Sequence, residues 1–163
     1  GRANYNFDDR YLFTATLRRD GSSRFGSAHK WGLFPSAAFS WRISQEKFYK
    51  SNLVSDLKFR ASYGVTGSQE IVNYNSLNTL SASSGGYIVG GTKVSIVMPS
   101  QYANPDLKWE ETAQTDIGID FSLLKGRVQG NLDWYNKKTS DLLLSIDVPS
   151  PSYISKQINL NEN

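Results

Sequence analysis

The residues best suited to chemistry in this chain are charged and amide side chains that recur at every second position of several segments. Lys58 and Arg60 alternate with apolar neighbours in one segment, and Asp116 and Asp120 do so in another. Side chains at this spacing can pair across neighbouring strands or line a polar surface. The complete set is Arg18, Arg42, Lys58, Arg60, Gln114, Asp116, Asp120, Asn131 and Asp133.

Several kinds of chemistry are excluded by composition. The 163 residues include no Cys, which excludes a disulfide framework, a thiolate metal site and a Cys nucleophile. The single His29 leaves no His-based metal cluster. No nucleophile–base pair or paired-carboxylate arrangement stands out, and the glycines at 85–91 lack the strand-then-helix setting of a phosphate loop. The sequence therefore predicts no enzyme, no metal and no cofactor. A net charge of +3, evenly spread, does not indicate nucleic acid as a partner.

The elements that must position the polar residues follow from a period of two. In one segment Ile117, Ile119 and Phe121 lie on one face, while Asp116 and Asp120 lie on the other, which is the pattern of a strand with one apolar face. Each such segment approaches the length of a transmembrane β-strand, roughly 9–11 residues. Strands are predicted at 11–18, 33–43, 57–66, 112–123 and 128–135, with further strands ending within 1–7 and beginning within 153–160.

The predicted connections alternate between short and long. Residues 8–9 and 124–126 form tight turns, whereas 19–32, 67–108 and 136–152 are long. Short turns at one end and long loops at the other are typical of outer-membrane barrels. The mean hydropathy of −0.45 agrees, because lumen-facing polar residues keep the average of a barrel hydrophilic. The fold class is therefore predicted to be all-β: an antiparallel up-and-down transmembrane β-barrel segment.

Aromatic residues provide a second indication of a membrane-spanning sheet. When the strands are laid alternately up and down, the aromatics fall near the two ends, and Ala, Ile, Leu and Val fill the middle. Amphipathic rings favour the headgroup zone, so these residues are expected to form an aromatic girdle. Those near the short-turn end are Tyr11, Trp41, Phe59 and Phe121, and those near the long-loop end are Tyr63, Trp109 and Trp134.

The polar faces allow two interpretations. They can form a lumen wall that contacts a plug or a passing substrate, or they can consist of ion pairs that satisfy the wall itself. The second interpretation predicts that Arg60 pairs with Asp116 and Lys58 with Asp120, to within one register step.

The long connection 67–108 is the stronger candidate for ligand recognition, because loops carry function more often than strands do. Its aromatic rings and amides suit sugars, peptides or a lid protein, although the same loop could simply pack on its neighbours. The residues are Asn73, Tyr74, Asn75, Tyr87, Gln101 and Tyr102. The apolar residues of 136–152 are expected to extend the strands above the membrane and contact a lid protein, or to form a plain hairpin extension.

Five blocks of sequence carry a family resemblance. Residues 9–26 read DRYLFTATLRRDGSSRFG, and 31–36 read WGLFPS. The blocks 57–69, 104–110 and 134–143 follow in the same order. Together they strongly resemble the barrel of SusC/RagA-type TonB-linked outer-membrane proteins.

This resemblance implies a barrel of about 22 strands around an N-terminal plug. It also implies import of glycans, oligosaccharides or peptides, driven by the TonB complex and assisted by a SusD-like surface lipoprotein. The expected location is the outer membrane of a Gram-negative, Bacteroidetes-like cell, in contact with its lipid. Residues 1–163 are expected to form part of one barrel domain, with the plug, the TonB box and the closing strand outside this sequence. Gly1 is not a start methionine, and the chain is expected to be a piece of a longer protein.

The predicted function is therefore the wall and external mouth of a TonB-dependent nutrient transporter. One alternative is a soluble β-sandwich that binds carbohydrate, in which the apolar faces would meet across a dry core. Another is an outer-membrane barrel with a structural or adhesive role and no transport.

Overall fold

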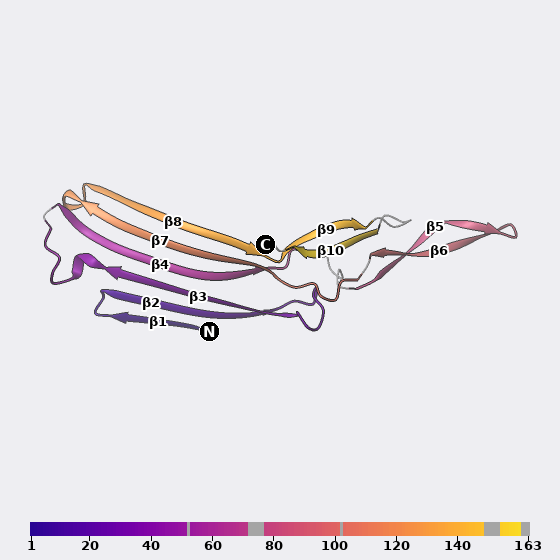
Figure 1. Cartoon of the computed structure of the whole chain (residues 1–163), viewed down its shortest axis with the longest axis horizontal. Coiled ribbons are helices and arrows are strands. Elements are labelled where there is room, and N and C mark those ends of the chain that lie inside the picture. Colours follow the sequence, from indigo (N-terminus) through magenta and orange to yellow (C-terminus); the bar gives the residue numbers. More distant parts are fainter. Residues whose placement is uncertain (52, 72–76, 102, 149–153, 161–163) are drawn as a thin grey trace. The chain divides into compact units, whose positions relative to one another are not determined.

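A computed structural model of the chain describes residues 1–51, 53–71, 77–101, 103–148 and 154–160. This part of the chain forms ten β-strands and two short turns of 3-10 type, η1 (Ile43–Gln45) and η2 (Leu124–Gly126) (Figure 1). The strands are β1 (Arg2–Phe7), β2 (Tyr11–Gly21), β3 (Trp31–Arg42), β4 (Val54–Ser68), β5 (Thr79–Val89), β6 (Thr92–Gln101), β7 (Glu110–Leu123), β8 (Val128–Ser140), β9 (Leu142–Val148) and β10 (Ile154–Leu160). Among the described residues, none of the helical segments is long and apolar enough to cross a membrane.

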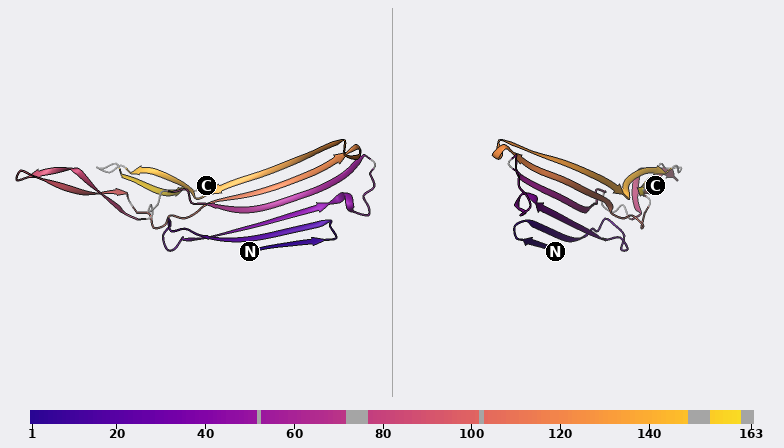
Figure 2. Two further views of the ribbon diagram at one scale, coloured as in Figure 1. Left: turned by 180° about the vertical axis from the view of Figure 1, so that it is seen from behind. Right: turned by 60° about the vertical axis from the view of Figure 1, so that its left-hand side comes forward.

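The first of two compact units contains a six-stranded sheet. It comprises Gly1–Asp20, Leu33–Gly67 and Thr112–Thr139. The strand order is β1-β2-β3-β4-β7-β8, and these strands lie side by side in one layer with alternating direction (Figures 1 and 2). All five predicted strands and the one expected within 1–7 are confirmed.

Tight turns at one end of this unit fix the antiparallel pairing. Asp8 and Asp9 both have positive φ, 53° and 50°, and Arg10 N–H donates to Phe7 O at 3.1 Å. This is the primed turn that matches the twist of a two-stranded hairpin. Leu124 and Lys125 also have positive φ, 53° and 56°, between β7 and β8. Both turns agree with the sequence prediction.

The register separates the residues of the sheet into two faces. Between β3 and β4, Phe39 is opposite Ala61, whereas Ser40 is opposite Arg60. Residues directly opposite each other in an antiparallel pair point to the same side. Odd positions of these two strands therefore form an apolar face and even positions a mainly polar one.

The apolar face of the first unit is exposed rather than covered. Phe13 is 45% exposed, Ile119 41% and Leu132 69%. A soluble sandwich would bury these side chains against a second sheet, and in the described residues of this unit they remain open. The alternative of a β-sandwich with a dry core is therefore wrong.

The second unit comprises Gly21–Gly32, Ser68–Glu111 and Ser140–Asn163. Its four-stranded sheet has the order β5-β6-β10-β9. The prediction that 67–108 is a loop was wrong, because it contains the hairpin of β5 and β6. This hairpin turns at Gly90 and Gly91, both with positive φ. Strand structure continues into 136–152, as its apolar residues predicted: β8 continues to Ser140, Asp141 turns with φ 55°, and β9 follows.

A small apolar core holds the second unit together. Leu107 is fully buried, Trp109 is 6% exposed, and Phe25 is 4% exposed. The rings of Phe25 and Trp109 lie 5.1 Å apart at a tilt of 41°. A Cβ at Gly26 would lie 2.7 Å from the carbonyl oxygen of Pro105, so only glycine allows these two segments to approach so closely.

Candidate functional site on the polar face of the six-stranded sheet

Arg60 is the centre of the polar face of the first unit. Its guanidinium donates two hydrogen bonds to Asp120, from Nε at 2.9 Å and from Nη2 at 2.8 Å. Nη2 also donates to Asp133 at 2.8 Å. One side chain of β4 thereby links β7 and β8. The bidentate pair with Asp120 fixes both the position and the orientation of the guanidinium.

This network corrects the predicted pairing. Arg60 pairs with Asp120 rather than with Asp116, and Lys58 does not take Asp120 as its partner. The physical reason is Gly118, which is buried beneath the fork. A Cβ at this position would lie 2.9 Å from Arg60 Nη2 and would collide with the carboxylate of Asp133. Because Gly118 has no side chain, Arg60 can reach over β7 to both carboxylates.

Neutral donors also bind carboxylates on this face. Asp116 accepts hydrogen bonds from Gln114 Nε2 at 2.9 Å and from Ser62 Oγ at 3.3 Å. Asp133 also accepts from Asn131 Nδ2 at 2.6 Å. These contacts satisfy the wall and leave carboxylate lone pairs that can accept from a ligand hydroxyl or amide.

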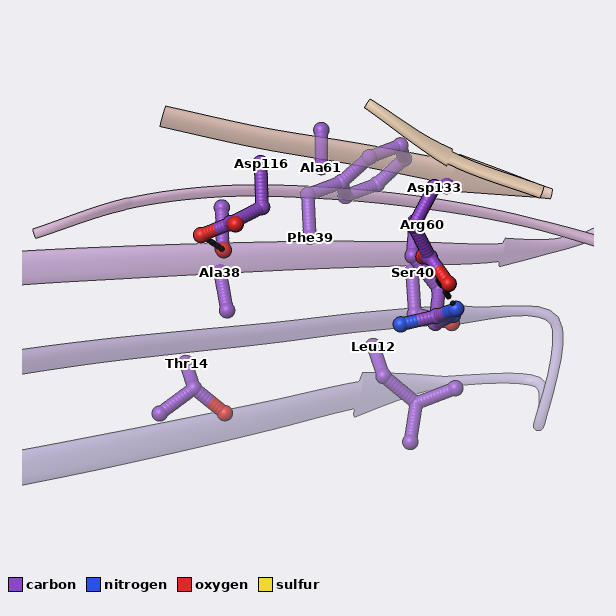
Figure 3. A pocket seen from close by; sticks show the side chains of 11 residues that line it. Leu12, Thr14, Ala38, Phe39, Ser40, Arg60, Ala61, Asp116 and Asp133 are labelled. Carbon is purple, nitrogen blue, oxygen red and sulfur yellow. Dashed lines mark hydrogen bonds and ion pairs between the residues drawn. The ribbon is translucent and has the colours of Figure 1, made fainter. Parts of the chain in front are cut away.

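A shallow groove of about 310 Å³ runs across this face. Arg60 and Asp133 lie at one end of it beside Ser40 and Leu12, and Asp116 and Thr14 lie at the other (Figure 3). The side chains of Arg60, Asp120 and Asp133 are each about two-fifths exposed, so solvent reaches the network. The groove offers hydrogen-bond acceptors, one engaged cation and apolar patches, which suits reversible contact with polar molecules.

Three further predicted polar-face residues lie outside this groove. Arg18 forms an ion pair with Asp20 at 2.7 Å, and its guanidinium lies 5.6 Å from the centre of the Phe34 ring. Arg42 is directly opposite Lys58 in the register of β3 and β4. Like charges in this position repel, so this pair does not stabilise the sheet.

Only two of the six predicted ligand residues of 67–108 belong to the described part of the chain. Asn73, Tyr74, Asn75 and Tyr102 lie outside the described residues. Tyr87 and Gln101 are described as backbone positions of β5 and β6, where they are paired within the hairpin. Their role as ligand or lid contacts stays a prediction.

The predicted girdle residues occupy different environments. Tyr11 and Trp41 stack at 6.1 Å with an interplanar angle of 13°, and Phe59 is opposite Trp41 in the register. Phe121 lies against Gly130, where a Cβ would come within 2.6 Å of its ring. Tyr63 is 48% exposed and Trp134 57% exposed. Trp109 differs, because it is buried in the core of the second unit and its ring does not reach the surface as a girdle residue must.

A compact cluster around Glu46 was not predicted from the sequence. Its carboxylate accepts hydrogen bonds from Tyr11 OH at 2.5 Å, from Trp41 Nε1 at 3.0 Å and from Arg10 Nη1 at 3.0 Å. The side chain of Glu46 is 9% exposed. The hydrogen bonds from Tyr11 and then Trp41 hold the pKa of Glu46 below its usual 4.5. The only sequence signal was a lone carboxylate in a turn beside predicted interfacial aromatics.

The described part of the chain contains no group of three or more His, Cys, Asp or Glu residues arranged to hold a metal ion. The chemistry visible on the polar face of the first unit is therefore hydrogen bonding and charge pairing by Asp, Asn, Gln, Ser and Arg.

Comparison with known proteins agrees with this architecture. Residues 1–162 match the family described as TonB dependent receptor-like, beta-barrel. The TonB-dependent receptor SusC of Bacteroides thetaiotaomicron is 42% identical over 165 residues, which cover 99% of this chain and 16% of that protein. The TonB-dependent receptor P3 of Formosa agariphila is 42% identical over 164 residues, with 99% and 16% covered.

Solved structures give the same result. The structure of the RagAB peptide transporter superposes with a TM-score of 0.82 at 34% identity, covering 97% of this chain and 17% of that one. The RagAB peptide importer in its "open-open" state superposes with a TM-score of 0.82 at 33% identity, covering 98% and 17%. The all-β antiparallel sheet thus matches a segment of the barrel of a TonB-dependent receptor. The chain belongs to the TonB-dependent receptor β-barrel family, and it spans about a sixth of the length of these relatives.

Proposed function

We propose that this chain forms part of the barrel wall and external loops of an outer-membrane transporter that imports oligosaccharides or peptides. The observation that carries the proposal is the six-stranded sheet, which exposes an apolar face on one side and a hydrogen-bonding face on the other. The apolar face suits lipid, and the polar face suits a lumen through which polar molecules pass.

The polar residues described above then have defined places. Arg18, Arg42, Lys58, Arg60, Gln114, Asp116, Asp120, Asn131 and Asp133 face the lumen. The Arg60 fork stabilises the wall, whereas the partly free acceptors of Asp116 and Asp133 contact the solute or the plug. Tyr11, Trp41, Phe59, Phe121, Tyr63 and Trp134 form the aromatic girdle.

The proposal includes the partners and the single barrel domain that are expected for the family. Residues 1–163 belong to one barrel domain, and energy comes from the TonB complex through a plug outside this sequence. A SusD-like lipoprotein covers the external mouth and contacts the loops of the second unit. Support comes from the relative named a TonB-dependent receptor SusC and from the two-component name RagAB of the matching structures.

The test uses cells that lack the gene for the whole protein, complemented with the unmodified gene or with single variants. Depletion of oligosaccharides and of peptides from the medium is measured by mass spectrometry. The unmodified gene restores depletion of one of the two classes. If deletion leaves depletion of both classes unchanged, although the complemented cells contain the folded barrel in the outer membrane, the structural or adhesive alternative is favoured.

A matched pair of substitutions tests the two faces in the same experiment. Ile119→Arg places a charge on the lipid face and is expected to cost about 2–4 kcal/mol at the bilayer midplane. It lowers the amount of folded barrel, measured by heat-dependent mobility on gels. Gln114→Arg, on the exposed polar face, leaves the amount of barrel unchanged and alters depletion. Equal losses of folded barrel would show that the assignment of the faces is wrong.

A further inference from the structure

Two connections share a surface at the tight-turn end of the first unit. Leu124 N–H donates to Leu53 O at 2.9 Å, which joins the β7–β8 turn to the β3–β4 connection. Ser55 Oγ donates to Ser122 O at 3.0 Å and reinforces the junction. Side chains far apart in the sequence therefore lie on one patch.

This patch combines exposed apolar and basic side chains, and we name it the basic–apolar rim. Phe48 is 69% exposed, Leu53 59% and Leu124 50%. Lys47, Lys50 and Lys125 are exposed beside them in the sequence. None of these lysines takes part in the ion pairs found among the described residues.

A polar cavity of about 560 Å³ adjoins the rim. It is lined by Lys50 together with Ser44, Tyr49, Ser51, Val54 and Ser55. Ser44 donates to Asp56, Tyr49 donates to Val54 O, and Ser51 Oγ accepts from Val54 N–H. The ammonium of Lys50 and the hydroxyl proton of Ser51 can therefore donate to an anion, and the serine oxygens keep lone pairs for a hydroxylated headgroup.

We propose that the basic–apolar rim binds the headgroup of an anionic phospholipid, with the phosphodiester on Lys50 in the serine-lined cavity. Lys47 and Lys125 add positive charge at the membrane surface, and Phe48, Leu53 and Leu124 contact the glycerol and the start of the acyl chains. The three large apolar side chains, each exposed by half or more, argue against a soluble anion as the ligand, because such an anion would not contact them. The three lysines, outside the ion pairs found among the described residues, argue against a neutral lipid, because its headgroup would not attract them. The inference rests on the proposed function, because the sheet must span a membrane.

The experiment uses the whole protein in vesicles of equal parts phosphatidylglycerol and phosphatidylcholine. This chain has no cysteine, so Gln45→Cys, next to the cavity-lining Ser44, carries a bimane fluorophore after any cysteine elsewhere in the protein has been replaced. A trace of spin-labelled lipid, of either headgroup, quenches the fluorophore in proportion to its local concentration. A lysine in contact with an anionic headgroup corresponds to about a fivefold preference, so quenching by the spin-labelled phosphatidylglycerol should be stronger by about that factor.

Lys50→Gln is expected to lower the quenching ratio to the smaller preference that Lys47 and Lys125 sustain. The matched control, Lys137→Gln with Lys138→Gln, removes two exposed lysines of β8 and should leave the ratio unchanged. Equal quenching by the two lipids in the unmodified protein, or a ratio indifferent to Lys50→Gln, overturns the proposal. Loss of the preference on addition of millimolar inorganic phosphate also overturns it, by assigning the cavity to a free anion.

A second label separates failure of this proposal from failure of the proposed function. Bimane at Ile119→Cys, on the exposed apolar face, should be quenched by both lipids to the same extent. If that quenching is present and the label at position 45 shows no preference, only the lipid-headgroup site is wrong. If the label at position 119 is not quenched at all, the sheet does not lie in lipid, and both proposals fail.

Discussion

The two units of the chain differ in whether a buried apolar core holds them together. The first unit exposes its apolar residues along a whole face of its sheet, with Leu132 69% and Ile119 41% exposed. The second unit buries some of its apolar residues in a small core, where Leu107 is fully buried, although its β5–β6 hairpin leaves Leu80 67% and Ile88 76% exposed. Both units come from one continuous sequence of unremarkable mean hydropathy, so composition alone does not distinguish them.

The difference indicates the solvent for which each unit is built. A sheet that leaves Ile, Leu and Phe open has no hydrophobic stabilisation in water and needs an apolar environment. A unit with a buried Phe–Trp–Leu core is stabilised in water by the hydrophobic effect. The six-stranded sheet therefore suits an apolar environment, and the core of the second unit suits an aqueous one.

The largest expected effect contrasts a core leucine with an exposed one. Leu107→Ala removes a fully buried side chain and should destabilise the second unit by about 2–5 kcal/mol. Leu132→Ala removes an exposed side chain and leaves no cavity, so its cost should be smaller. Pulse proteolysis of the whole protein in detergent at increasing urea measures both, with cleavage within 68–111 reporting the second unit and cleavage within 112–139 the first.

A comparable loss in the two variants would contradict the contrast between the units. Exposed Leu80→Ala, on β5, is the control inside the second unit, because its side chain is 67% exposed and lies outside the core. It should leave cleavage within 68–111 unchanged.

The next effect concerns the polar face of the first unit and compares a crowded glycine with a less crowded one. Gly118→Ala forces a methyl group against Arg60 and Asp133 and should cost about 1–3 kcal/mol through overpacking. Gly64→Ala is the matched control on β4, because its Cβ would meet Ser36 Cβ at 3.3 Å and needs only a slight shift. Urea midpoints of the whole protein in detergent give both values.

A double-mutant cycle identifies the source of the cost. In the Asp133→Ala background the carboxylate that collides with the new methyl group is gone, so Gly118→Ala should cost less than it does alone. If the cost is the same in both backgrounds, strain in β7 itself explains the effect, and the fork is not responsible.

The strands of the first unit could be predicted from sequence because a buried or lipid-facing side chain at every second position leaves a clear period of two. The hairpin of β5 and β6 could not, since Leu80, Ile88 and Val97 are exposed and give no amphipathic pattern. Its one signal was Gly90–Gly91 between β-branched residues, which fits a two-residue primed turn. That signal was weaker than the polar, glycine-rich composition around it.

The polar network was predicted in type but not in pairing. Opposite charges on neighbouring strands indicated cross-strand ion pairs, and such pairs form, but between other partners than predicted. Which partners meet depends on Gly118, because a guanidinium extends across a position that has no side chain. Alternation specifies the face of each residue and leaves the reach of a long side chain undetermined. Glu46 shows the same limit, since three donors from two strands and a turn converge on it only in the folded chain.

The smallest expected effect is confined to the tight-turn end of the first unit and depends on pH. Hydrogen bonds from Tyr11 and Trp41, with Arg10 adjacent, hold the pKa of Glu46 below 4.5. The stabilisation is therefore present above pH 4.5 and is lost as the pH falls through the lower pKa of the folded state. Hydrogen exchange of residues 43–50, corrected for intrinsic rates, should accelerate in that acidic range. Glu46→Gln should exchange several-fold faster above pH 5 and approach the unmodified protein in acid, whereas exposed Glu70→Gln should match the unmodified protein throughout. An acid response that persists in Glu46→Gln would remove Glu46 as its cause.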